Sequence, residues 1–483
     1  MKKIYRLSLI AAMALSTVSC SFDTDLTQNI DTPDAYDGVQ DVKNGMIGAY
    51  YALGHYGFLG NYAIAIGDFA GGLAQGNPNA GHFVEETDYT LDEYNAELEG
   101  IWAYGYKVVD RSVRTINGAN GVLANAASLH LTDADKAELY SYKSQCFGLR
   151  ALANFYLANV FCYPYSKGTT NKGLPIFKDK PVEAFQNATR ANVGDTYEYI
   201  LEDIDSALVN NSKATKDYNP NEFYMNSAAI NALKARVLLY MGKYAKAEAA
   251  AKEALSLKGN GEDPTLPSND IYLSNWASIS INDEDIFTIS KTESDNLSAN
   301  ALNTLYGSYD GTVTSYCQSL FSETDVRAKL IGEIEDNSPT CLKWQGLPTS
   351  QAVSNIPVFR KSEMYLIIAE CEARVGSLSE AVKYVMYTAK RDPKVTEAAL
   401  SSKTKDELLD FIWNENAREF FGEGHFYYDA RRLDKTITVN GGQSNPFRPA
   451  DFVYPIPGSE IDAGFMKDQN ENWSDGLPTM KEE

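Results

Sequence analysis

Apolar residues recur at helical spacing in four segments of the chain: 40–56, 95–118, 134–163 and 194–210. In the last segment the apolar residues are Tyr197, Ile200, Leu201, Ile204 and Leu208. Residues three and four apart lie on the same face of a helix, so each segment predicts an amphipathic helix that packs its apolar face against a core. The simplest interpretation is that these helices form the scaffold of the protein.

Residues 225–257 predict two helices that meet at Gly242. The positions of Ala235, Gly242, Tyr244, Ala247 and Ala254 match the spacing of a tetratricopeptide repeat, in which small side chains let two antiparallel helices approach closely. We expect Gly242 and Ala247 to lie at such a close contact.

A second copy of this pattern runs from Lys361 to Arg391. Ala369, Gly376, Leu378 and Ala381 take the positions that Ala235, Gly242, Tyr244 and Ala247 hold in the first copy. The two copies are not tandem, because residues 258–358 separate them. This intervening region is rich in Asn, Ser, Asp, Gly and Pro, with short β-like runs such as 285–289, and predicts a loop-rich insertion. Loops on a rigid scaffold are a common place for a binding site.

The first residues of the chain predict an exported lipoprotein. Lys2, Lys3 and Arg6 precede a short apolar run that ends in small residues at Ser19, just before Cys20. This order is typical of a secretion signal over residues 1–19, and the pattern resembles the bacterial lipobox, although Thr17 stands where Leu is usual. We therefore expect lipidation at Cys20, which would hold the protein at a membrane; ordinary secretion is the alternative.

Composition narrows the class of partner and the number of domains. The 483-residue chain has a formal net charge of −22, which disfavours nucleic acid as a partner because phosphate neutralisation needs clustered Lys and Arg. Beyond Cys20 an odd number of cysteines without a Cys-x-x-Cys pair implies neither a disulfide framework nor a zinc cluster. The length allows two or three domains, but no Pro/Ser-rich linker is present, so we expect a single globule.

Five stretches of the sequence together resemble one known family, the SusD/RagB family of Bacteroidetes, which is named after the starch-utilisation system. The stretches are residues 148–160, 232–244, 360–371, 419–432 and 454–462, the last containing the Pro-Ile-Pro signature at 455–457. They occur in the family's order behind a lipoprotein signal. One departure is the segment 468–473, which lacks the Pro-Gly that often follows Gln-Asn in relatives.

The resemblance implies a fold, a location and a partner. It implies a mainly α fold of about four tetratricopeptide-like helix pairs with loop-rich insertions, in a chain divided into the signal (1–19), an N-terminal SusD-like region (20–220) and a C-terminal SusD/RagB region (221–483). It also implies a surface-exposed lipoprotein of the outer membrane that acts as a lid on a SusC-like TonB-dependent barrel. The family carries no catalytic residues and implies no cofactor.

The candidate catalytic residues give little support to an enzyme. The four histidines, His55, His82, His130 and His425, form no metal-binding spacing. His425 lies near Asp429, Arg431 and Arg432, and we favour a buried structural network there over a catalytic dyad. A glycoside hydrolase would need a cleft holding two carboxylates, which a sequence with 65 acidic residues can neither identify nor exclude.

A sugar-binding site needs an exposed aromatic platform beside amide, acidic or backbone groups, because a sugar ring has an apolar face and a rim of hydroxyls. Two loop segments fit, and relatives hold their ligand in similar regions. In residues 67–83 the candidates are Asp68, Phe69, Asn77, Asn79, His82 and Phe83. In the insertion they are Trp276, Tyr306, Tyr309 and Trp344, with further rings at Tyr272 and Tyr316.

The leading hypothesis is capture of oligosaccharide for a TonB-dependent transporter, without catalysis. The alternative is a peptide-binding or protein-binding lipoprotein of the same uptake system. Rings of residues 270–345 that lie exposed beside amides would favour sugar, whereas rings that line an apolar groove would favour peptide.

Overall fold

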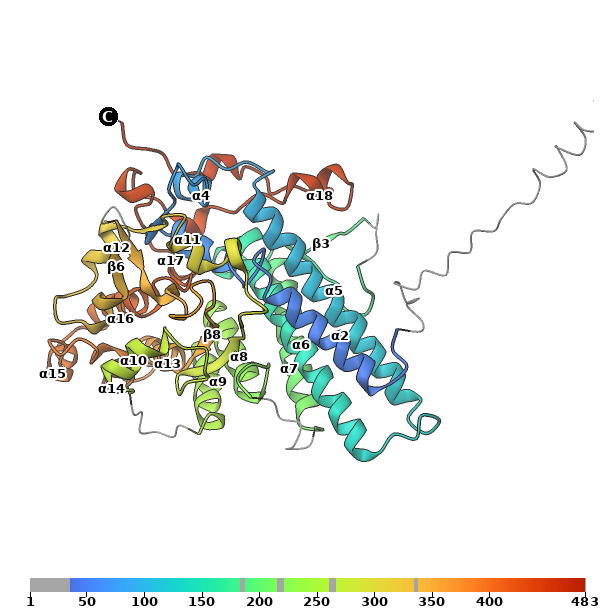
Figure 1. Cartoon of the computed structure of the whole chain (residues 1–483). Helices are drawn as coiled ribbons and strands as arrows, with labels where there is room; N and C mark the ends of the chain where they lie inside the picture. The colour runs from blue at the N-terminus through green and yellow to red at the C-terminus, as the bar shows by residue number, and fades with distance from the viewer. Residues whose placement is uncertain (1–34, 183–186, 215–220, 260–265, 334–337, 483) are drawn as a thin grey trace, which may run out of the picture.

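The N-terminal part of the chain folds into long helices that pack side by side and occupy the right half of Figure 1. They are α2 (Val39–Leu53), α5 (Ala96–Ala124), α6 (Asp133–Phe161) and α7 (Val193–Asn211). The computed structural model describes residues 35–182, 187–214, 221–259, 266–333 and 338–482, so the expected signal and Cys20 lie outside the described residues. All four predicted amphipathic helices are confirmed.

Local sequence explains where these helices begin. The side chains of Asn95, Thr132 and Asn192 each accept a hydrogen bond from a backbone N–H in the first turn of α5, α6 and α7. Such caps satisfy donors that have no partner within the helix. Along the bundle α2 packs on α5, α5 on α6 and α6 on α7. None of the helices in the described ranges is long and apolar enough to cross a bilayer.

Two further helix pairs follow, as the repeat pattern predicts: α8 (Ser227–Tyr240) with α9 (Tyr244–Leu257), and α13 (Lys361–Val375) with α14 (Leu378–Ala389). α9 also packs on α13, so the two repeats are neighbours in space although they are distant in sequence. Ala235, Ala247 and Ala254 are fully buried. The tetratricopeptide-like architecture is confirmed.

Gly242 does not have the role that the sequence suggested. A Cβ at this position would meet nothing nearer than the Tyr244 hydroxyl at 4.0 Å, so Gly242 is not at a close helix contact. Its backbone φ is +69°, in the left-handed region that glycine adopts without steric cost. Glycine is needed there for the turn between α8 and α9.

The region between the repeats consists of short elements. They are α10 (Asn269–Asn275), β4 (Asp285–Ile289), α11 (Leu302–Tyr306), β5 (Thr312–Val313), α12 (Ser315–Ser319), β6 (Ile331–Glu333), β7 (Pro339–Cys341) and β8 (Ile356–Arg360). β4 pairs antiparallel with β8, which leads directly into α13, and β6 pairs antiparallel with β7. The strand expected at 285–289 is confirmed.

The remaining elements close the fold around this insertion. They are α3 (Tyr62–Phe69), β1 (Ala74–Gln75), α4 (Val84–Asp88), β2 (Lys172–Pro175), β3 (Arg190–Asn192), α15 (Glu397–Ser401), α16 (Lys405–Phe420), α17 (Phe426–Arg432) and α18 (Gly458–Asp462). α17 packs on α3, so the C-terminal part of the chain contacts the N-terminal part. One hydrophobic core runs across the expected boundary at residue 220, and a division there stays a prediction.

A buried network of charges fixes the insertion to the C-terminal helices. Arg327 pairs with Asp325 at 2.8 Å and with Glu415 at 2.7 Å. Arg360 pairs with Glu419 at 2.9 Å and with Glu423 at 2.8 Å. Removing one partner of a buried ion pair costs roughly 3–5 kcal/mol, because the other charge is left without compensation. The network therefore holds the loops of the insertion in a defined position on the helical scaffold.

Candidate ligand-binding site

A short strand pairing brings the two sequence-selected segments together. β1 pairs antiparallel with β5, with Ala74 opposite Val313 and Gln75 opposite Thr312. The Thr314 backbone N–H and hydroxyl extend this contact to the carbonyls of Leu73 (2.9 Å) and Gly72 (2.8 Å). The loop that follows β1 and the loop that precedes β5 consequently lie side by side, near the labels α4 and α11 in Figure 1.

Aromatic and polar side chains from the two loops meet at the surface. The ring of His82 stacks on that of Tyr309, with centroids 4.1 Å apart and planes at 18°. Asn77 Nδ2 donates a hydrogen bond to Asp310 Oδ2 at 3.1 Å. His82, Tyr309, Asn77 and Asp310 are all partly exposed, and Asn79 is exposed. We call these five residues the loop site.

Local hydrogen bonds define both loops of the loop site. Asn77 Oδ1 accepts from the Asn79 N–H at 2.9 Å, and the Asn77 carbonyl accepts from the N–H groups of Ala80 and Gly81. In the facing loop the Tyr309 N–H donates to the Thr304 carbonyl at 2.9 Å. A loop that is already ordered loses less entropy when a ligand binds, so this arrangement favours binding.

Three of the candidate rings lie beneath the loop site instead of in it. Phe69, Phe83 and Tyr306 are buried, with the Phe69 ring centroid 5.0 Å from that of Phe83 and 5.6 Å from that of Tyr306. The expected exposure of these rings is wrong, because they pack against one another and fill the space under the paired strands. They support the loops and offer no face to a ligand.

Asp68 and Trp344 are also buried, against expectation. Asp68 Oδ2 accepts a hydrogen bond from the Gly424 N–H at 2.9 Å, and Trp344 Nε1 donates to the Gly422 carbonyl at 2.8 Å. Burial raises the pKa of Asp68 to about 8. Both side chains therefore hold the 422–424 turn against the rest of the fold.

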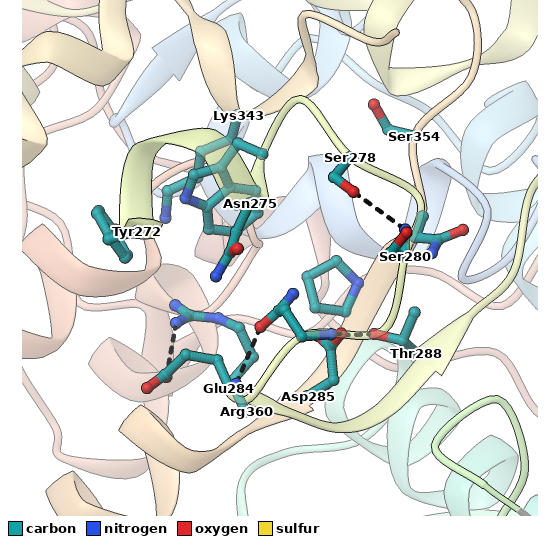
Figure 2. Close-up of a pocket in the computed structure, with 14 residues that line it drawn as sticks. Tyr272, Asn275, Ser278, Ser280, Glu284, Asp285, Thr288, Lys343, Ser354 and Arg360 are labelled. Atoms are coloured by element: carbon teal, nitrogen blue, oxygen red, sulfur yellow. Dashed lines mark hydrogen bonds and ion pairs between the residues drawn. The ribbon is translucent and has the colours of Figure 1, made fainter. Parts of the chain in front are cut away.

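Trp276 lies apart from the loop site, beside the cavity that Figure 2 shows. Its ring is partly buried and faces two cations, the Lys343 ammonium 4.7 Å and the Arg360 guanidinium 5.5 Å from the ring centroid. Arg360 also lies 3.5 Å from the Glu284 carboxylate, and Figure 2 labels both side chains. The cavity has a volume of about 40 Å³, far below the 300 Å³ or so of a small-ligand site. It fits water molecules and not a sugar ring.

His425 stacks on Phe420 with centroids 4.3 Å apart. Burial, together with nearby Arg and Lys side chains, holds the pKa of His425 well below its usual value, so the ring is neutral. Asp429 bonds instead to Arg432 at 2.5 Å, and Arg432 also pairs with Glu370. This arrangement matches the structural network favoured from the sequence and contains no His–Asp pair.

The sequence candidates did not include Asp310, which the structure places at the loop site. Asp310 has a positive φ of 53° and precedes Gly311. An Asp-Gly pair is a turn signal, so this segment could have been recognised as a tight turn beside Tyr309. Tyr316 on α12, with 42% of its surface exposed, is a further ring of the insertion that faces solvent.

Comparison with known families gives two matches in this chain. Residues 342–474 match the SusD family, and residues 76–239 match a family described as "Starch-binding associating with outer membrane". A SusD-like protein of Formosa agariphila is 33% identical over 94 residues. That alignment spans 19% of the relative's length.

Solved structures resemble the chain over most of its length. A SusD superfamily protein of Bacteroides thetaiotaomicron has a TM-score of 0.77 at 24% identity, covering 90% of this chain and 99% of the other. A SusD superfamily protein of Bacteroides vulgatus has a TM-score of 0.76 at 25% identity, with the same coverage. A SusD-like carbohydrate binding protein of B. vulgatus has a TM-score of 0.68 at 20% identity, covering 83% of this chain and 84% of the other.

Proposed function

The chain belongs to the SusD/RagB family, and on this premise we propose that it captures oligosaccharide at the cell surface through the loop site. We further propose that it delivers the sugar to a SusC-like TonB-dependent transporter in the outer membrane, to which a lipid on Cys20 anchors it. The descriptions of the matching family and of one structural relative, which name starch binding and carbohydrate binding, support the sugar ligand.

The observation that carries the proposal is the ring pair of His82 and Tyr309 beside Asn77 and Asp310. Partly exposed rings can cover the apolar face of a sugar, while an amide and a carboxylate exchange hydrogen bonds with its hydroxyls. The peptide alternative receives less support, since the rings of Tyr272, Tyr306 and Trp344 are buried and line no apolar groove at the loop site.

We propose binding without catalysis. Glycoside hydrolysis needs an acid with a raised pKa that reaches the glycosidic oxygen. Near the loop site, burial raises the pKa of both Asp68 and Glu86 to about 8, but both carboxyl groups are buried and out of reach of a substrate.

The experiment uses the mature protein and calorimetric titration with neutral oligosaccharides, beginning with maltoheptaose and continuing with cello-, manno-, xylo- and laminari-hexaose. We expect Tyr309→Ala and His82→Ala each to weaken binding about tenfold, as loss of a stacked ring removes on the order of 1.4 kcal/mol. Both side chains are partly exposed, so the fold should persist, which circular dichroism would verify.

Tyr94→Ala is the matched control, because Tyr94 is an exposed tyrosine outside the loop site. Equal affinity of all three variants and the parent would refute the loop site. Release of shorter sugars by the purified parent protein would refute binding without catalysis.

A further inference from the structure

A hollow larger than the cavity beside Trp276 lies away from the loop site. It has a volume of about 570 Å³ and is bordered by α2, the turn after α2, the strand β4 and the chain around 290–297. This volume is within the range of small-ligand sites, which is about 300–1,000 Å³. No residue of the loop site borders the hollow, so it is a separate place on the surface.

Exposed apolar side chains form one wall of this hollow. Tyr51 and Ile47 lie one helical turn apart on α2, with 63% and 43% of their surfaces exposed. Large apolar side chains that are this exposed contribute little to the packing of the hydrophobic core. Tyr51 in particular presents a ring that a ligand can cover.

Other rings that border the hollow are held in place. Tyr50 meets Tyr224 edge to face, with centroids 5.5 Å apart, and its hydroxyl accepts from the Met225 N–H at 2.7 Å. His55 stacks on Tyr104 with centroids 3.5 Å apart, and burial lowers the pKa of His55 to about 4, so this ring is neutral. Tyr50 and His55 are thus held in place by contacts within the protein, before any ligand binds.

Lys291 and Asp295 both border the hollow, the first as a charged hydrogen-bond donor and the second as a charged acceptor. The side chain of Lys291 is 8% exposed, and its ammonium lies 3.7 Å from the Asp295 carboxylate. This distance is too long for a hydrogen bond, so both groups keep capacity for a ligand. Burial lowers the pKa of Lys291, whereas Asp295 opposes that effect.

We propose that this hollow is a second carbohydrate-binding site, which takes one ring of a neutral oligosaccharide against Tyr51 and two adjacent hydroxyls between Lys291 and Asp295. A vicinal diol both accepts from an ammonium and donates to a carboxylate, which matches this pair. The carboxylate balances the ammonium, and the chain has a net charge of −22, so an acidic sugar is disfavoured. The inference rests on the proposed function, since it assigns a second place for the same class of ligand.

The test repeats the calorimetric titrations with the same five neutral oligosaccharides on Tyr51→Ala and Lys291→Met. Tyr51 is exposed, so its replacement should leave the fold intact, and Lys291→Met keeps the apolar stem while it removes the charge. We expect each variant to bind sugar about tenfold more weakly, or to bind one sugar molecule fewer per protein molecule. If Lys291→Met fails to fold, Asp295→Asn, at an exposed position, takes its place.

Combining Tyr51→Ala with Tyr309→Ala distinguishes the two sites. Weakening of binding in the double variant beyond that of either single variant, with each single variant keeping one site of parental affinity, supports two sites. If Tyr51→Ala binds like the parent while Tyr309→Ala is impaired, the second site is refuted and the proposed function stands. If only Tyr51→Ala is impaired, the loop site is refuted instead. A parent protein that binds none of the five sugars refutes both.

Discussion

The Asp68 carboxyl group is enclosed by protein, so its protonation makes the free energy of unfolding depend on pH. Burial is the main cause of its raised pKa of about 8, and the Gly424 N–H and the Lys343 ammonium oppose the shift without cancelling it. A group whose pKa is raised by folding stabilises the folded state below its unfolded pKa of 3.8. That contribution is lost progressively as pH rises towards 8.

We therefore predict that Asp68→Asn reduces the loss of thermal stability that the protein shows at alkaline pH. Asparagine keeps an oxygen that can accept from the Gly424 N–H and has no charge to bury. The melting temperature of the variant should rise relative to that of the parent as pH increases from about 4 to 8, and the difference should be largest near pH 9. Midpoints that stay parallel from pH 5 to pH 9 would contradict the assignment. Glu86, with a pKa also raised to about 8, should leave a residual slope in the variant.

At the residue scale the sequence could select two loops that meet in the structure, but not which of their rings are exposed. Tyr306 and Tyr309 are three residues apart in the same loop-rich region, yet Tyr306 is buried against Phe69 and Tyr309 meets His82 at the surface. Whether a loop ring faces solvent depends on contacts with residues more than two hundred positions away. No local pattern carries that information, and replacing Tyr306 by Ala should now cost stability instead of testing binding.

At the element scale the small residues of the helix pairs set how closely helices approach. Ala247 is fully buried where α9 packs on α8 and α13. Ala247→Leu should lower the free energy of unfolding by about 1–3 kcal/mol through overpacking. Ala249→Leu is the matched control, because Ala249 is exposed on the same helix and should tolerate the same change. Denaturant unfolding of both variants measures the difference, and equal losses would argue against a close contact at Ala247.

The helices were predictable because their apolar periodicity extends over many residues. α2, α6 and α7 begin and end within a few residues of the expected bounds, whereas α5 extends beyond its expected end, to Ala124. The pairing of β1 with β5 could not be predicted, since strands of two residues show no alternation and the partners are far apart in sequence. That pairing builds the loop site, so the site had to come from the tertiary structure.

At the scale of the whole molecule we predict that a lipid on Cys20 holds the protein at the outer membrane. Cys20→Ala should release the protein into the soluble fraction, because it removes the expected site of lipidation. Fractionation of cells that lack the proposed partner transporter measures this, since such a transporter would otherwise retain the variant. A variant that still sediments with the outer membrane after high-salt washes would show that lipid on Cys20 is not the anchor.

Because every residue carries the same backbone amide and carbonyl, the pairing of β1 with β5 forms with little regard to the side chains in the adjoining loops. If the loop site binds sugar as proposed, mutations at Asn77, His82, Tyr309 or Asp310 change what the loops recognise while β1 and β5 stay in register. Under the proposed function, single substitutions at the surface can in this way alter which sugars a lineage takes up, with the helical scaffold and its core left unchanged.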